Sequence, residues 1–120
     1  MGRIDKVNQA VKREVSSIIH GELKDPRLQF VTITQVEVTK DLQHAKIYFS
    51  VLGDQKSAEK ADLGLNSAKG FVRRLVGQRI RMRYTPEIEF IYDRTVEYGV
   101  RIEQALEEIK HESEHDHQDD

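Results

Sequence analysis

Six Lys and Arg residues occur between positions 69 and 83 with no Asp or Glu among them. Guanidinium groups can hold phosphate oxygens in pairs, so this density of arginine suits a polyanion. The same stretch contains apolar residues at helical spacing, including Val72, Leu75 and Val76, and is therefore too apolar for a disordered basic tail. The pattern predicts a folded surface that binds phosphate groups. The six basic residues are Lys69, Arg73, Arg74, Arg79, Arg81 and Arg83.

Two further groups of basic residues are candidates for the same surface. A solvated surface explains them as well as a phosphate contact does. Asp25 and Pro26, which lie between the basic residues Lys24 and Arg27, are typical of a turn. The first group is in the predicted N-terminal helix and consists of Arg3, Lys6 and Arg13, and the second follows that helix and consists of Lys24 and Arg27.

The formal net charge of −2 conceals an uneven distribution of charge. Residues 1–110 hold 19 basic and 16 acidic residues, a formal charge of +3, whereas residues 111–120 hold five acidic residues and no Lys or Arg. We expect one folded domain over residues 1–110 and a disordered, acidic, His-containing tail at 111–120. An acidic tail on a basic domain is common in nucleic-acid-binding proteins, where it weakens non-specific attraction to phosphate.

Several classes of protein are excluded or disfavoured. The chain has no cysteine, so disulfides, thiolate metal sites and cysteine nucleophiles are impossible. No apolar run approaches the roughly 20 residues of a membrane span, and we expect a cytoplasmic protein without membrane contact. The sequence has no phosphate-binding glycine loop and no zinc-protease helix, so it indicates no enzyme, no cofactor and no small-molecule substrate.

Two small groups of residues could be interpreted as a catalytic set and a metal site, but both interpretations are weak. Ser16, Ser17 and His20 share one predicted helix, but a chance grouping explains them better than a catalytic set does. Three histidines of the tail have a spacing that would allow them to bind a metal, although nothing in a flexible tail would fix their geometry. They are His111, His115 and His117.

The first half of the chain predicts a helix followed by a β-hairpin. Apolar residues recur every three or four positions from Ile4 to Ile19, and Gly21 and then Pro26 end this helix. The segments "FVTITQVEVT" and "HAKIYFSVLG" predict two strands, joined by the short "KDLQ" connection as an antiparallel hairpin. The apolar residues of the first strand change phase near Thr34, which predicts a bulge there.

The second half predicts an interrupted helix, a strand and a last helix. The helix begins near Ser57, breaks at Gly70 and closes near Gly77, with Leu75 on its core side. An extended lead-in follows, in which Ile80, Met82 and Tyr84 alternate with arginines, and a third strand ends at Asp93. Apolar spacing from Val96 to Ile109 suggests the last helix.

Aromatic residues are few in this pattern. Tyr84 and Tyr92 are expected to pack in the core, with their hydroxyls at its rim. Tyr48 is expected to point away from the core and is a weak candidate for base stacking.

These elements give an α+β domain in which a three-stranded sheet is packed against helices in the order α-β-β-α(kink)α-β-α. This is the architecture of KH-type RNA-binding domains of the second topology. Such domains usually carry a Gly-x-x-Gly loop at the helix break, where the absence of Cβ atoms lets a nucleic-acid backbone come close. Here the break contains Ser67, Ala68, Lys69 and Gly70, so the first glycine is missing.

The chain resembles the bacterial ribosome-binding factor A family, whose KH-like domain carries Ala-x-Gly at the helix kink. Ala68, Lys69 and Gly70 match that motif, and so do the collinear segments "ELKDPRL", "VEVTKDLQHAKIYFSVLG", "RRLVGQRIRMRYTPEIEFIYD" and "RIEQALEEI". The resemblance implies a factor that binds free 30S small ribosomal subunits. It also implies a role in late maturation of 16S rRNA, including processing of its 5′ end, and in adaptation to cold.

A protein-interaction module is the alternative, in which the basic α/β surface binds an acidic protein partner. Salt dependence separates the two hypotheses, because phosphate binding releases counterions and gives a steep log–log slope of about one unit for each phosphate contacted. We expect a monomer in either case, since no apolar stripe is left over once the helices cover the sheet.

Overall fold

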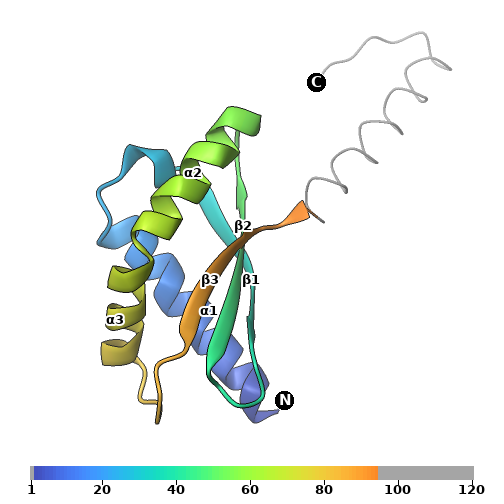
Figure 1. Ribbon diagram of the computed structural model, residues 1–120, viewed down its shortest axis with the longest axis vertical. Helices are drawn as coiled ribbons and strands as arrows, with labels where there is room; N and C mark the ends of the chain where they lie inside the picture. The colour runs from blue at the N-terminus through green and yellow to red at the C-terminus, as the bar shows by residue number, and fades with distance from the viewer. Residues whose placement is uncertain (1, 95–120) are drawn as a thin grey trace, which may run out of the picture.

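The computed structural model describes residues 2–94, which form an α+β domain (Figure 1). The order of the helices and strands confirms the predicted KH-like topology over the described residues. The helix predicted from Val96 to Ile109 and the tail at 111–120 lie outside them. The elements are α1 (Arg3–Gly21), the 3-10 turn η1 (Pro26–Leu28), β1 (Val31–Val38), β2 (His44–Val51), α2 (Gln55–Ser67), α3 (Lys69–Arg79) and β3 (Glu87–Tyr92).

The sheet has the strand order β1-β2-β3, with β1 antiparallel and β3 parallel to the central strand. The pairing of β1 with β2 shifts register between Ile33 and Gln35, which confirms the predicted bulge. Because a bulge inserts one residue, it returns the strand to phase. Ile33 and Val36, which differ by an odd number of positions, are therefore both buried on the same side.

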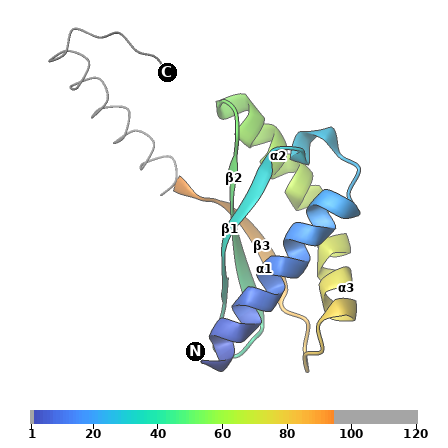
Figure 2. The ribbon, with the colours of Figure 1, turned by 180° about the vertical axis from the view of Figure 1, so that it is seen from behind.

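The three helices among the described residues cover one face of the sheet, and Figure 2, turned by 180° from Figure 1, shows α1 in front of the strands. From α1, the residues Val11, Val15, Ile18 and Ile19 are buried against it, as the stripe predicted. Strand alternation places Ile47 and Phe49 in this core, and leaves side chains such as Glu37, Lys46 and Glu89 on the opposite, open face.

The break in the long helix lies at Ala68, within the predicted kink and two residues before Gly70, where the helical pattern was expected to stop. Ala68 closes α2 and opens α3 with φ −95° and ψ 1°. The Gly64 carbonyl accepts hydrogen bonds from both the Ala68 N–H and the Ser67 hydroxyl, at 3.2 and 3.0 Å. A hydroxyl that bonds back to the preceding turn bends a helix, and this contact accounts for the break better than glycine does. Gly70 lies inside α3, where a Cβ would meet no atom within 4 Å.

Helix α3 continues to Arg79 and does not close at Gly77. A Cβ on Gly77 would lie 2.5 Å from Thr85 Oγ1, so the glycine is needed for close packing of the returning chain against α3. Glycine at this position is therefore a packing requirement that resembles a helix terminus in the sequence.

The segment between α3 and β3, residues 80–86, has no regular secondary structure. Ile80 and Met82 pack against the core, but Tyr84 is 57% exposed, so the prediction of a core position for Tyr84 is wrong. Tyr92 is half-buried, and its ring meets that of Phe49 edge-on with the centroids 5.7 Å apart. The alternation of buried and exposed side chains that is typical of a strand fails at Tyr84, because no strand partner holds the segment in an extended conformation.

Two glycines of α3 give a test of this packing. Gly70→Ala should stabilise the domain by about 0.5 kcal/mol, because alanine favours the helix and the space is open. Gly77→Ala gains the same propensity but must displace Thr85, and should destabilise the domain by about 1–2 kcal/mol. Urea denaturation of both variants measures the difference. Equal stability of the two variants would contradict the close packing at Gly77.

Candidate nucleic-acid interface

Arg73 faces the protein as much as the solvent. Its Nε donates to Pro86 O at 3.1 Å and its Nη2 donates to Thr85 O at 2.9 Å. Nη2 also lies 3.2 Å from Glu87 Oε2. Glu87 lies in β3, 14 positions after Arg73 and beyond the acid-free stretch of residues 69–83. Arg73 therefore fastens α3 to the chain that enters β3.

Arg79 is held in a similar way by the first helix. Its Nη2 lies 3.1 Å from Glu22 Oε2 and its Nη1 lies 3.6 Å from Glu14 Oε1. The two carboxylates lie eight positions apart in and just beyond α1. Arg79 thus joins the end of α3 to α1, with its charge already partnered.

Arg27 closes the turn that the sequence predicted at Asp25 and Pro26. Its Nη2 donates to Asp25 Oδ2 at 2.7 Å, and its Nε donates to both carboxylate oxygens. The Arg27 side chain and then its backbone N–H lower the pKa of Asp25 by hydrogen bonding to the carboxylate. This turn packs on α2, because a Cβ on Gly64 would lie 3.1 Å from both Asp25 Oδ2 and Leu28 Cδ2.

The remaining four cations of the basic stretch are exposed, and within residues 2–94 none forms a salt bridge with an acidic side chain. We call them the basic surface. The Arg74 guanidinium lies 5.3 Å from the centroid of the Phe71 ring, and that of Arg83 lies 5.5 Å from the Tyr84 centroid. Stacking limits the motion of a guanidinium and leaves its N–H edge available to an anion. The basic surface consists of Lys69, Arg74, Arg81 and Arg83.

The glycine of the kink motif also belongs to this region. Gly70, Arg74 and Gln78 follow one another at four-residue spacing on the exposed side of α3. Since a Cβ on Gly70 would meet no atom within 4 Å, the glycine leaves the helix surface beside Arg74 open. A phosphate backbone can approach the helix closely at that position.

The other candidate cations lie on α1 and on the segment that follows it. Arg3, Lys6 and Arg13 are exposed along α1, and the first two lie at the end of that helix that is away from α3 (Figure 2). Lys24 and Arg27 are nearer, because they line a hollow that also includes Ser67 and Ala68 at the helix break.

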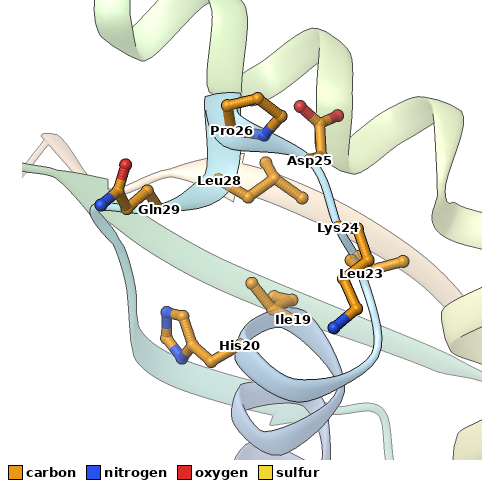
Figure 3. A pocket seen from close by; sticks show the side chains of 8 residues that line it. All are labelled: Ile19, His20, Leu23, Lys24, Asp25, Pro26, Leu28 and Gln29. Carbon is orange, nitrogen blue, oxygen red and sulfur yellow. The ribbon is translucent and has the colours of Figure 1, made fainter.

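A second hollow lies between the end of α1 and η1, and Figure 3 shows the side chains around it. Ile19 and Leu28 are core residues that form part of its wall. The Nε2 atom of His20 lies 2.8 Å from Val31 O, so the backbone engages this ring nitrogen. This contact connects α1 with the start of β1 and gives His20 a structural role.

Tyr48 lies on the open face of the sheet, opposite the core residues of its strand, as predicted. Its hydroxyl donates to Glu37 Oε1 at 3.1 Å. Burial, and then the hydrogen bond to Glu37, raise the pKa of Tyr48. The neighbouring carboxylates of Glu37 and Glu89 make this face unfavourable for phosphate.

Tyr84 is the residue of this region that sequence reasoning missed. Its position between Arg83 and the Thr85-Pro86 pair was a usable signal, since proline after a short polar run favours a loop over a strand. Tyr84 occupies every second position together with Ile80 and Met82, and this strand-like alternation favoured a core position over that signal.

The described residues show no metal-binding group of three or more His, Cys, Asp or Glu side chains. The histidines at positions 111, 115 and 117 lie outside those residues. Within residues 2–94, no helix has the length and apolar character needed to cross a membrane.

A family model described as Ribosome-binding factor A matches residues 3–106. The Halothermothrix orenii protein of that name is 44% identical over 117 residues, which cover 98% of this chain and 96% of the relative. The chain belongs to the ribosome-binding factor A family.

A crystal structure and a fitted homology model from the ribosome-binding factor A family are similar to this chain over most of its length. The crystal structure of the protein from Thermus thermophilus has a TM-score of 0.68 and 27% identity, and the match covers 77% of this chain and 97% of that one. A homology model of the Thermus thermophilus factor, fitted into a cryo-EM map of a 30S complex, has a TM-score of 0.56 and 25% identity. That match covers 76% of this chain and 91% of the fitted one. Both agree with the KH-like fold.

Adjacent arginines of α3 test the division between held and exposed cations. Arg73→Ala should destabilise the domain by about 1–2 kcal/mol, because two backbone carbonyls lose charged donors. Arg74→Ala removes the same group from an exposed position and should change the free energy of unfolding by less than about 0.5 kcal/mol. Chemical denaturation distinguishes them, and an Arg73→Ala variant as stable as Arg74→Ala would contradict the fastening role of Arg73.

Proposed function

We propose that this chain binds the small ribosomal subunit through phosphate groups of 16S rRNA, using the basic surface. The observation that carries the proposal is the set of four exposed cations that have no acidic partner within residues 2–94. Membership of the ribosome-binding factor A family supports it, as does the similar Thermus thermophilus factor that was fitted into a 30S complex.

The chemistry of the surface suits a folded RNA. Each cation that contacts a phosphate releases condensed counterions, which supplies affinity without requiring a particular base sequence. The partnered arginines have a different role, because Arg73 and Arg79 hold α3 against β3 and α1. A surface that is already rigid loses little conformational entropy when it binds.

Binding without catalysis is sufficient for a role in subunit maturation. A protein that prefers one of two RNA conformations shifts their populations by its difference in affinity for the two. RNA helices open more slowly in the cold, so such a shift matters most at low temperature. We extend the proposal to a monomeric, cytoplasmic, non-enzymatic factor that binds free 30S subunits, assists late maturation of 16S rRNA and its 5′ end, and supports growth in the cold.

A matched pair of double variants tests the proposal. Arg74→Ala with Arg81→Ala removes two charges from the basic surface, and Lys40→Ala with Lys46→Ala removes two from the hairpin. Binding to purified small subunits is measured over a range of salt concentrations. We expect the first pair to reduce the log–log salt slope by about two units and the second pair to leave it nearly unchanged.

Three outcomes would count against the proposal. An equal reduction of the salt slope in both double variants would mean that binding depends only on net charge. A shallow salt slope in the parent protein would favour an acidic protein partner. Co-sedimentation that is as strong with assembled ribosomes as with free small subunits would exclude a role confined to assembly.

A further inference from the structure

Tyr84 is an exposed aromatic ring within the basic surface. It is 57% exposed, the Arg83 guanidinium lies 5.5 Å from its centroid, and Arg81 lies three positions before it. Single exposed apolar side chains are ordinary on protein surfaces. Exposure of this ring needs a second observation before it indicates a function.

That second observation is the rigid support beneath the ring. Arg73 donates hydrogen bonds to the carbonyls of the next two residues, Thr85 and Pro86. Pro86 is buried, and Thr85 packs so closely on Gly77 that a Cβ there would lie 2.5 Å from Thr85 Oγ1. On the other side, Ile80 and Met82 pack against the core. The backbone around Tyr84 is therefore anchored at both ends while its ring remains outside.

We propose that Tyr84 stacks on an unpaired base of the RNA while Arg81 and Arg83 bind the neighbouring phosphates. The inference rests on the proposed function and specifies its target, a single-stranded or bulged nucleotide. Within an A-form helix the faces of the bases are covered by their neighbours, so only an unstacked base can accept an aromatic ring. A ring on a fixed backbone stacks with little loss of conformational entropy.

The charges near Tyr84 favour RNA over an apolar protein pocket. A pocket that enclosed the ring would also have to remove water from Arg81 and Arg83, which is costly for charged groups. RNA provides both complements at once, because each nucleotide carries a π face and a phosphate. Arg73 is on this view a positioning residue, which holds the segment that presents the ring.

Fluorescence gives a direct test, because the chain contains no tryptophan. Tyr84→Trp places a single indole at the proposed stacking position. A single-stranded oligoadenylate of about 12 nucleotides and an RNA duplex of equal length serve as probes. At equal occupancy we expect the single strand to quench the indole emission strongly and the duplex to leave it nearly unchanged.

Phe30→Trp is the matched control. Phe30 is 55% exposed and precedes β1 at the end of the sheet where Val31 pairs with Val51. Tyr84 precedes β3 at the opposite end, where Glu87 pairs with His44. The control indole should not be quenched. Equal quenching in the two variants would indicate non-specific contact and overturn the inference.

Affinity for purified small subunits gives a second readout. Tyr84→Phe keeps the ring and should bind like the parent, whereas Tyr84→Leu should bind about tenfold more weakly or worse. The salt slope should stay unchanged in both, since no phosphate contact is lost. Urea denaturation should show equal stability, because the side chain is exposed.

The outcomes separate this inference from the function on which it depends. If Arg74→Ala with Arg81→Ala lowers the salt slope while Tyr84→Leu binds like the parent, RNA binding stands and base stacking is wrong. If neither variant affects binding, the proposed function fails as well. A blue shift of the Tyr84→Trp emission on small subunits without quenching would place the ring against protein and overturn the stacking.

Discussion

The forked contact from Arg73 to the carbonyls of Thr85 and Pro86 is the interaction on which the arrangement of the basic surface depends. Residues 80–86 have no regular secondary structure, so their backbone polar groups need partners from outside the segment. A guanidinium reaches both carbonyls from the neighbouring helix. Lysine could not replace it, because an ammonium group lacks the planar fork. Gly77 completes the contact by letting the two chains approach.

This constraint divides the positive charges of one continuous stretch between two tasks. Arg73 and Arg79 pair with acids and carbonyls of other elements and fix α3 in place. The four cations of the basic surface remain exposed on the frame so formed. RNA binding by a partnered arginine would require its existing ion pair to be broken, whereas an exposed arginine has no ion pair to break. Exposed and partnered arginines thus differ in what they can bind, although they look alike in the sequence.

Much of the fold could be predicted from the chain, because each element follows from a local pattern. The stripe on α1, the hairpin and the bulge near Thr34 all depend on residue order and periodicity. The break at Ala68 was predicted only approximately, since its cause is a hydroxyl contact to Gly64 and not the flexibility of glycine. The helix end was misplaced because Gly77 is required by a neighbour eight positions away.

The sequence by itself determined the family, the order of the elements and the presence of a basic stretch, since these depend on residue identity along the chain. Only the tertiary structure decided which cations are free and that Tyr84 faces solvent. Glu14, Glu22 and Glu87 become partners of arginines only when α1, α3 and β3 pack together. Periodicity reports which side of an element faces the core, but it carries no information on the contacts between elements that are distant in the chain.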